Sequence, residues 1–348
     1  MNKARLFKII VSLALAACCM LACGCAYVAI SEDRVQEGLA DLDPEEGVAR
    51  DITVTLYYRL TDERYLVGVT RNVGVRANER EGNAIIRTLL SGVPLLSGNV
   101  SALFGTGVSL VDVMLEGSIL YVTLSREFLD ETALNKTKNE LRSFYEKNMY
   151  TQEEYEARVA QVEAKANEER ALAVYSLVNT LTQYFDDGVR VQFLVDTSAT
   201  GTGERLTRSR LGIAVAEGAD SELVEPMSFV QDVVASASSV MDCALRHMQK
   251  GEYEFAYPLF AESENDESQK PAYAAFETEM LALGVLESYE IRGAREYERE
   301  NYAYVYVDLK FRYAGGRENT IQNARLFMKR EGDLYKVGHE TYMRVLND

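Results

Sequence analysis

An uncharged apolar run near the N-terminus decides where the rest of this chain folds. Residues 1–8 include Lys3, Arg5 and Lys8, and the apolar run then extends from Ile9 to Ala22. A basic head followed by about fourteen apolar residues is typical of a secretory signal, and such a run is too short to span about 30 Å of hydrocarbon as a stable helix. The remaining residues are therefore predicted to fold outside the cytoplasm.

The end of the apolar run resembles the lipobox of bacterial lipoproteins. The segment Leu21-Ala22-Cys23-Gly24-Cys25 places small residues directly before a cysteine. The resemblance implies cleavage after a signal peptide of residues 1–24 and attachment of diacylglycerol to the Cys25 thiol. Cys18 is the alternative acceptor, and a plain signal peptide is the alternative without lipid. Acyl chains hold a protein on the membrane without a basic patch, so the predicted membrane contact is the N-terminal lipid alone.

A chain that begins at Cys25 retains few groups for chemistry. Only Cys243 is then left as a free thiol, so no intrachain disulfide forms and the fold depends on buried apolar side chains. The sequence contains two histidines and carries a formal net charge of −17 without any run of Lys and Arg. Metal and acid–base sites rely on His and Cys, and nucleic-acid binding relies on basic surfaces. We therefore predict no metal, no cofactor and no nucleic-acid partner.

The 348 residues are too many for one ordinary core and indicate two folded domains. Residues 25–50 are polar and acidic without periodicity, as expected for a flexible tether. A first domain is predicted over residues 51–216. A polar linker, residues 217–227, ends after Pro226 and leads to a second domain over residues 228–348. Because this linker has little apolar content, the two domains are predicted to be separable.

The first domain alternates between strand and helix patterns. Apolar residues alternate from Ile52 to Arg59 and again from Tyr65 to Val75, which predicts a hairpin of two half-buried strands. Further predicted elements are a helix around residues 85–90, a hairpin of residues 108–113 and 119–124, a helix over residues 169–185 and a strand over residues 189–195.

Four short motifs in this domain resemble the GerM domain of bacterial sporulation and spore germination lipoproteins. They are Val54-Thr55-Leu56-Tyr57-Tyr58, Leu89-Leu90-Ser91-Gly92-Val93-Pro94, Val122-Thr123-Leu124-Ser125-Arg126-Glu127-Phe128 and Asn179-Thr180-Leu181-Thr182 before the strand of residues 189–195. The resemblance implies a small α/β module outside the cell membrane, without known catalytic residues, that acts in envelope assembly. The chain departs from the family in the loop of residues 196–201 and in a long insertion, residues 131–168.

The insertion is charged and helical in character. Thr151 and Glu154 form a predicted capping box, and Tyr155, Val159, Val162 and Ala166 then share one stripe. We expect one helix from Gln152 to Phe185 and an antiparallel partner over residues 135–148. The hairpin either docks another envelope protein or packs its stripe on its own partner helix, with its charges in solvent.

The second domain places helices before strands. One long helix is predicted from Phe229 to Gly251, and strands follow over residues 286–291, 302–313, 320–330 and 334–340. This order defines an α+β domain. Residues 244–253 and 331–337 resemble the opening and closing segments of the nuclear transport factor two-like, cone-shaped fold. Enzymes and non-enzymes share that fold, so it does not settle the chemistry.

The candidate site residues of this domain each allow two interpretations. His247 and His339 could meet across the cone with Asp242 or Glu340 to move a proton, or they are two unrelated surface histidines. The row Tyr302, Tyr304 and Tyr306 either lines a groove for a sugar or peptide or forms a cross-strand ladder, and we expect the ladder. No catalytic motif is present, so no catalytic residue is predicted.

These features together predict a lipid-anchored extracytoplasmic binding or scaffolding protein of the bacterial envelope rather than an enzyme. The GerM resemblance alone implies the connection with sporulation or germination, and other envelope proteins are the expected partners. The alternative is a small-ligand carrier or an enzyme that uses the cone. A deep apolar cavity with a histidine and a carboxylate would favour the alternative, and a cone filled by its own aromatic side chains would count against it.

Overall fold

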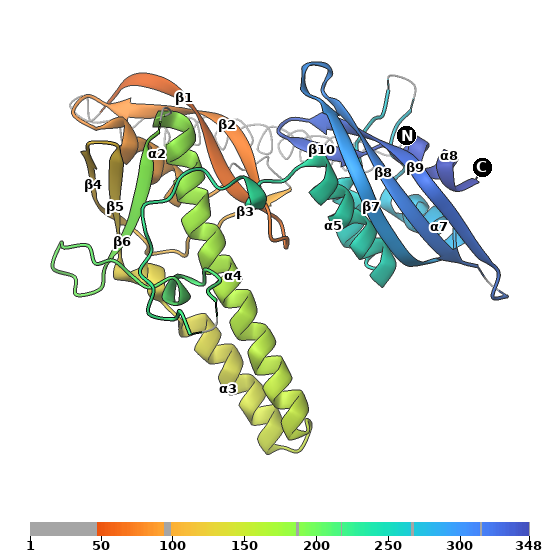
Figure 1. The fold of residues 1–348 in the computed structure, drawn as a ribbon, viewed down its shortest axis with the longest axis horizontal. Coiled ribbons are helices and arrows are strands. Elements are labelled where there is room, and N and C mark those ends of the chain that lie inside the picture. The colour runs from red at the N-terminus through yellow and green to blue at the C-terminus, as the bar shows by residue number, and fades with distance from the viewer. Residues whose placement is uncertain are drawn as a thin grey trace, which may run out of the picture. The chain divides into compact units, whose positions relative to one another are not determined.

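The computed structural model describes residues 47–93, 99–185, 188–216, 218–265, 268–313 and 315–347. The predicted signal peptide, both candidate lipidated cysteines and nearly all of the tether lie outside these ranges. Within them, no helix combines the length and the hydropathy that a membrane crossing needs. The fold is α+β, as predicted, with helices and three sheets (Figure 1).

Two small sheets form the N-terminal region, residues 51–216. The first has the strand order β2-β1-β3 and consists of β1 (Val48–Leu60), β2 (Leu66–Arg76) and β3 (Val100–Ser101). The second has the order β4-β5-β6 and consists of β4 (Leu110–Glu116), β5 (Ile119–Ser125) and β6 (Arg190–Asp196). Both predicted hairpins are present. Since β5 and β6 are parallel, the chain needs a long crossover between them, which η1 (Arg126–Leu129) and two helices provide.

Helices α2 (Glu81–Leu90) and α4 (Gln152–Phe185) complete this region. Buried polar side chains join α4 to β1 in addition to apolar packing. The Ser176 hydroxyl donates to the Tyr57 carbonyl oxygen, and the Tyr57 N–H donates to Thr180 Oγ1 over 3.0 Å. Both hydroxyls are fully buried and both have partners, so their burial carries no penalty for an unmade hydrogen bond.

The insertion forms the predicted helical hairpin, in which α3 (Thr132–Glu146) runs antiparallel to the first half of α4 (Figure 1). The capping box is confirmed, because Thr151 Oγ1 accepts from the Glu154 N–H and Glu154 Oε2 accepts from the Thr151 N–H. Residues Tyr155, Val159 and Val162 are half-buried on the side that packs against α3. The predicted stripe therefore packs on its own partner helix.

The C-terminal region begins with short helical segments and ends in an antiparallel meander with the order β10-β9-β8-β7. Its elements are η3 (Gln231–Val233), α5 (Ala237–Lys250), α6 (Tyr253–Ala256), η4 (Tyr257–Leu259), α7 (Tyr273–Ala282), β7 (Val285–Tyr297), η5 (Glu298–Glu300), β8 (Tyr302–Arg312), β9 (Glu318–Glu331), β10 (Leu334–Val337) and α8 (His339–Asn347). The predicted order of helices before strands is confirmed.

The strand predicted over residues 286–291 extends to Tyr297, and two further predicted boundaries in this region are wrong. The helix predicted from Phe229 begins only at Ala237, because Ser236 and Ser239 form a capping box and the Ala235 N–H donates to the Leu66 carbonyl oxygen of β2. The strand predicted to reach Glu340 ends at Val337, and the chain turns into α8. In both cases, a hydrogen bond to a distant part of the chain overrides the local pattern.

The buried core of the C-terminal region includes side chains from the N-terminal region. Leu60 and Val67 of the β1–β2 hairpin belong to the same buried cluster as Val240, Leu245 and the apolar faces of β7 to β10. The predicted linker is also packed, since Met227 pairs with Val191 of β6 in both directions. The expectation that the two regions separate freely is therefore wrong, because a core contributed by both cannot be cut without exposing it.

We predict that Leu60→Ala weakens the C-terminal region as well as the hairpin that carries it. Leucine-to-alanine replacement at a fully buried site costs about 2–5 kcal/mol, and Leu60 contacts the cluster around α5. The amides of α5 should therefore exchange faster in Leu60→Ala than the same amides do in the unaltered protein. The control is Leu177→Ala, which removes an equally buried leucine of α4 outside this cluster. Unchanged α5 protection in Leu60→Ala would contradict the shared core.

Candidate functional site

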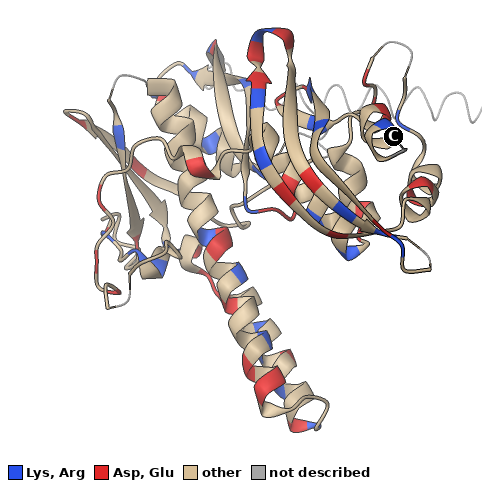
Figure 2. Cartoon of the chain, turned by 45° about the vertical axis from the view of Figure 1, so that its right-hand side comes forward, with Lys and Arg blue, Asp and Glu red and all other residues tan. Residues whose placement is uncertain are grey.

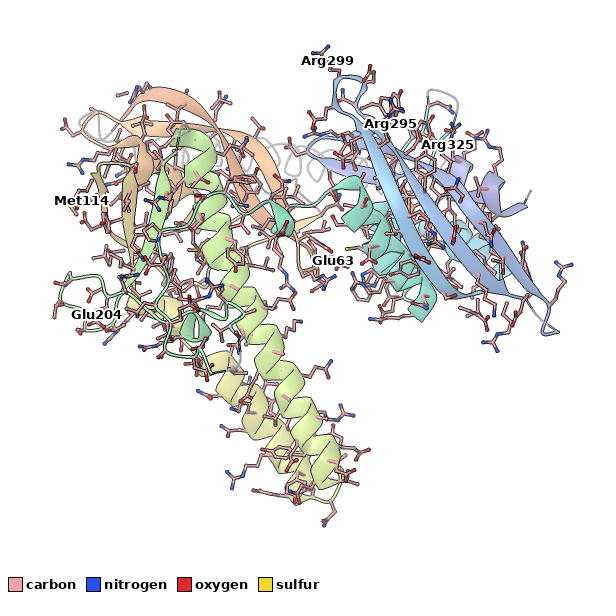
Figure 3. All side chains as sticks on the ribbon, in the orientation of Figure 1. Glu63, Met114, Glu204, Arg295, Arg299 and Arg325 are labelled. Atoms are coloured by element: carbon pink, nitrogen blue, oxygen red, sulfur yellow. The ribbon has the colours of Figure 1, made fainter. Side chains whose placement is uncertain are left out.

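The first candidate residue, His247, lies on α5 and is buried against the turn of the β1–β2 hairpin. Its Nε2 is 2.8 Å from Oε1 of Glu63, and its Nδ1 is 2.8 Å from Oε2 of Glu252. The second oxygen of Glu63 accepts from Arg246 Nη2 over 2.7 Å. Glu63 is only 3% exposed, and His247 is 9% exposed. Glu63 is labelled in Figure 3. The interpretation of His247 as an exposed helix residue is therefore wrong.

The contacts of Glu63 and His247 define their charge states. Burial alone would raise the pKa of Glu63, but the hydrogen bonds from His247 and Arg246 outweigh it and hold the pKa at about 2. The hydrogen bond to Glu63 raises the pKa of His247 above its usual value, burial opposes this, and Glu252 adds to it. A carboxylate only accepts hydrogen bonds, so a histidine that faces two carboxylates donates from both nitrogens. His247 is thus an imidazolium.

This cluster does not support proton transfer or nucleophilic catalysis. Both nitrogens of His247 and both oxygens of Glu63 already have partners, so neither group is free to take a proton from a substrate. The nearby Cys243 is fully buried, and burial raises the pKa of its thiol far above neutrality. Asp242, the predicted partner of His247, instead accepts from the Tyr289 hydroxyl over 2.9 Å. The cluster joins the hairpin to α5 and has no catalytic geometry.

The second candidate, His339, has different partners from His247. It is the first residue of α8 rather than an edge-strand residue, and its ring lies beside Phe260 and Phe276 of the core. Its Nε2 is 2.9 Å from Oε2 of Glu279 on α7, although the two atoms are not aligned for a hydrogen bond. Burial lowers the pKa of His339, and Glu279 opposes this. The structure does not bring the two histidines together.

His339 and Glu279 line an open cavity of about 660 Å³. A neutral imidazole beside a carboxylate is the arrangement that a general base uses, so this cavity is where an acid–base chemistry would have to occur. Glu340, which we considered as a partner of His339, lines the same cavity but accepts a hydrogen bond from Asn265 over 3.4 Å.

The interior of the C-terminal region is filled by aromatic side chains. Phe260, Phe276 and Tyr342 are fully buried, and Phe260 makes edge-to-face contacts with the other two at centroid distances of 4.9 and 5.6 Å. A filled cone is the observation that counts against a ligand inside it.

No group of three or more His, Cys, Asp and Glu side chains within the described ranges could hold a metal ion.

The tyrosine row is confirmed as a cross-strand ladder. Tyr302, Tyr304 and Tyr306 are half-buried on one face of β8, and the alternate residues Ala303, Val305 and Val307 are fully buried on the other. The ring of Tyr302 stacks on Tyr297 of β7 at 4.7 Å, and Tyr304 meets Phe327 of β9 at 5.7 Å. The ladder leaves part of each ring exposed.

The projecting part of the hairpin, α3 and residues 152–170 of α4, includes no buried residue. None of the residues of α3 is buried, and the buried residues of α4 begin only at Ala171. Acidic and basic side chains both occur along the hairpin (Figure 2). At its tip, the side chains of Phe144 and Met149 are 39% and 62% exposed. Phe144 packs edge-to-face on Tyr150, so the exposed apolar tip has a defined structure.

Sequence reasoning missed the carboxylates that hold the two histidines. Glu63 lies in the turn between the two predicted strands of the first hairpin. No sequence motif marks Glu63, Glu252 or Glu279 as a partner of a histidine. The spacing of charges along the sequence carries no signal for Glu63, since it lies 184 residues from His247. Glu252 had a weak local signal, because it follows Gly251, whose left-handed backbone ends α5 and turns the next residue back toward the helix.

Comparison with known proteins gives structural neighbours only. No protein-family model matches the chain, and no curated protein matches it either. Among solved structures, the chain is similar to the tandem GerMN domains of the sporulation protein GerM from Bacillus subtilis, with 16% identity over 56% of this chain and 51% of that chain and a TM-score of 0.30. It is also similar to a candidate lipoprotein from Clostridium perfringens, with 17% identity over 51% of this chain and 87% of that chain and a TM-score of 0.24. The chain thus spans about half the length of the GerM structure.

The cluster around Glu63 predicts a defined pH dependence of stability. The contribution of Glu63 is present above its usual pKa of 4.5 and is lost as the pH falls toward about 2. The contribution of His247 is complete below its unfolded pKa of 6.5 and is lost as the pH rises through its raised folded pKa. The shift of Glu63 corresponds to about 3 kcal/mol at neutral pH.

Denaturant unfolding of the protein and of Glu63→Gln at a series of pH values tests this. We expect the difference in free energy of unfolding to be largest between about pH 4.5 and 6.5 and to shrink on both sides. The control is Glu204→Gln, which removes a carboxylate from an exposed loop. A difference that does not change with pH would show that Glu63 and His247 are not an ion pair.

Proposed function

We propose that this protein is a lipid-anchored, extracytoplasmic scaffolding protein of the cell envelope, connected with sporulation or spore germination, that binds a partner protein through its helical hairpin. The anchor is supported by the signal pattern and Cys25, and the process by the GerM-like motifs of residues 54–58, 89–94, 122–128 and 179–182. The observation that carries the binding role is the hairpin of α3 and α4, which extends away from its sheet without a buried outer face.

The hairpin makes few contacts that would explain it as a part of the core. Residues 152–170 of α4 precede the first buried residue and correspond to about 28 Å of helix. Its own stabilising contacts are the half-buried stripe, the stacked rings of Tyr145 and Tyr155 at 5.0 Å, and the Lys138–Glu163 ion pair. An amphipathic helix usually obtains its stability by covering a core, and neither α3 nor residues 152–170 of α4 include a buried residue. Its remaining faces are available to a partner.

The chemistry at the base of the hairpin indicates the kind of partner. A groove of about 460 Å³ lies between α3, α4, η1 and the loop of residues 103–108. Leu103, Phe104 and Phe128 provide apolar lining. The charged lining residues are four acidic ones, Glu127, Asp130, Glu131 and Glu169, and two basic ones, Lys165 and Arg170. Apolar pockets with acidic side chains beside them are complementary to a protein segment that carries an apolar residue next to basic ones. The formal charge of −17 favours the same partner at longer range.

One observation favours a second function. His339 and Glu279 line the 660 Å³ cavity, and burial lowers the pKa of His339, which keeps the imidazole available as a base. A small-ligand carrier or an enzyme would use this cavity. The scaffold is the better supported proposal, because the cone behind the cavity is filled by Phe260, Phe276 and Tyr342.

We predict that the tip of the hairpin is needed for partner binding. In Phe144→Ser with Met149→Ser, the free energy of unfolding should change by less than about 1 kcal/mol, since both side chains are substantially exposed. A photo-crosslinking amino acid at position 149 should form a defined adduct with one envelope protein in intact cells, and the same group at position 281 should not. Leu281 is a matched control, because it is 61% exposed on α7.

The competing function is tested in the same cells. His339→Ala should leave both the crosslinked adduct and the envelope phenotype unchanged, and Phe144→Ser in the chain that carries the crosslinker at position 149 should reduce the adduct about tenfold. If the His339→Ala protein folds but loses function, and the double variant of Phe144 and Met149 keeps function, the scaffold proposal is wrong and the carrier or enzyme proposal takes its place.

We predict that Cys25→Ala abolishes labelling by radioactive fatty acid and leaves an unprocessed precursor. The reason is that acylation and cleavage both require the thiol that follows the apolar run. Cys18→Ala is the control and should be labelled normally. Labelling that persists in Cys25→Ala and disappears in Cys18→Ala would assign the lipid to Cys18.

A further inference from the structure

One face of the C-terminal sheet carries aromatic and basic side chains in register. Across β7, β8 and β9, Arg295 is paired with Tyr304 and then with Phe327, and in the next row Tyr306 is paired with Arg325. Paired residues of neighbouring strands share a face of the sheet. This face is opposite to the one that packs on the core, since the alternate residues of β8 are fully buried. Arg295 and Arg325 are both exposed (Figure 3).

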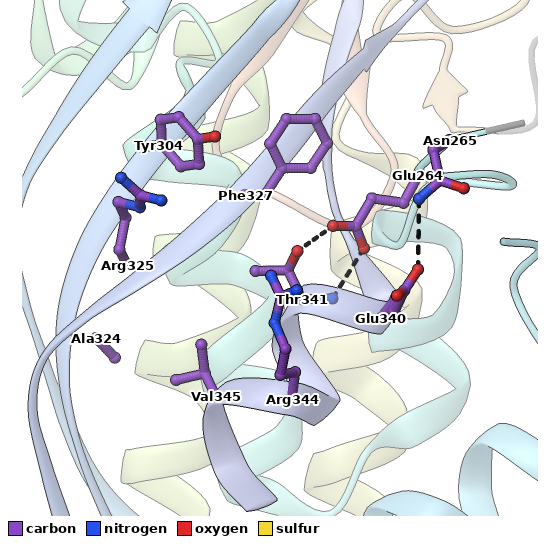
Figure 4. Close-up of a pocket in the computed structure, with 10 residues that line it drawn as sticks. All are labelled: Glu264, Asn265, Tyr304, Ala324, Arg325, Phe327, Glu340, Thr341, Arg344 and Val345. Carbon is purple, nitrogen blue, oxygen red and sulfur yellow. Dashed lines mark hydrogen bonds between the residues drawn. The ribbon is translucent and has the colours of Figure 1, made fainter. Parts of the chain in front are cut away.

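A cavity of about 570 Å³ lies where this face meets α8 (Figure 4). The sheet contributes Tyr304, Arg325 and Phe327, and α8 contributes Thr341 and Arg344. The guanidinium of Arg325 lies 4.5 Å from the centroid of the Tyr304 ring, so the aromatic ring holds the cation at the wall of the cavity.

Two carboxylates line the cavity, and Glu264 has partners on both of its oxygens, whereas Glu340 has, among the described residues, a partner on Oε2 only. Glu264 accepts from both the N–H and the hydroxyl of Thr341, which caps the first turn of α8, and Glu340 accepts from Asn265. Within the described parts of the chain, neither Arg325 nor Arg344 has a carboxylate within 4.0 Å. The hydrogen-bond donors that remain for a ligand are therefore those of two arginines.

We propose that this cavity binds a saccharide that carries an acidic group. Arg325 and Arg344 provide charge-assisted hydrogen bonds to the carboxylate or phosphate, and guanidinium groups suit both because their donors form a planar fork. The half-buried rings of Tyr304 and Phe327 meet edge-to-face, and each ring offers apolar surface to the ring of the sugar. The ladder continues from Tyr304 to Tyr302 at 5.7 Å and on to Tyr297, so an oligosaccharide has further rings to contact.

This site is independent of the proposed scaffold function, because it shares no residue with the hairpin of α3 and α4. The test uses the purified full-length chain and calorimetric titration with three probes. They are trigalacturonic acid, which is a carboxylated saccharide; glucose 6-phosphate, which is a phosphorylated one; and maltotriose, which is neutral. We expect at least one acidic probe to bind and maltotriose to bind about tenfold more weakly or not at all.

Four variants separate the contributions. Arg325→Ala and Arg344→Ala should each lower the affinity for the acidic probe about tenfold, as expected for the loss of a hydrogen bond to a charged group. Phe327→Leu keeps the volume nearly unchanged and should weaken binding by removing the flat ring. Arg299→Ala is the control, because it removes the same charge from the exposed η5 turn outside the cavity. It should bind within about twofold of the unaltered protein.

The outcomes are distinguishable. Binding of only one acidic probe identifies the acid as carboxylate or phosphate. No heat with either acidic probe, equal binding of maltotriose, or binding that survives both arginine replacements would overturn the proposal. The thermal unfolding midpoint of each variant is measured first, and Phe144→Ser with Met149→Ser should bind the probes normally. A loss of binding in that hairpin variant would contradict the independence of the two sites.

Discussion

The carboxylate of Glu63 is buried at the end of the β1–β2 hairpin, and its burial is tolerated only because two consecutive residues of α5 donate to it. Arg246 and His247 each donate a hydrogen bond to one oxygen of Glu63. The second ring nitrogen of His247 is hydrogen-bonded to Glu252. A buried ion pair is costly to break, since the partner that remains is a buried charge without compensation. The N-terminal hairpin and α5 are therefore held in one arrangement, and Leu60 and Val67 complete the apolar core beside it. This contact makes the two regions of the chain depend on each other.

The elements that local pattern determines were predicted well. Strand alternation, the hairpin of residues 108–113 and 119–124, and the capping box at Thr151 need only neighbouring residues, and all are present. The segment before Ala237 has helical spacing, but its backbone is paired with β2 at Leu66. Likewise, α8 begins at His339 because Glu264 accepts from the N–H of Thr341, which is 77 residues away in the sequence. Both errors come from hydrogen bonds between residues that are distant in the sequence.

The same reasoning explains what could and could not be predicted at the candidate sites. The positions of His247 on a helix and of the tyrosines on one face of a strand follow from periodicity alone. The partners of the histidines do not, because proximity in sequence suggested Asp242 and Glu340, and the fold supplied Glu63 and Glu279. The tether and both candidate lipidated cysteines are a separate case, since the structure describes neither, and the anchor still rests on the sequence.

The packing of the C-terminal region limits where this protein can bind anything. Phe260, Phe276 and Tyr342 fill the interior, and emptying such a core to admit a ligand would cost about 3–5 kcal/mol for each large aromatic removed. Binding on outer surfaces has no such cost, because the hairpin tip, the groove at the base of the hairpin and the aromatic face of the sheet are already exposed. A surface that is ordered before a partner binds reduces the conformational entropy that the protein itself loses on binding. The tip of the hairpin has this property, because Phe144 packs edge-to-face on Tyr150.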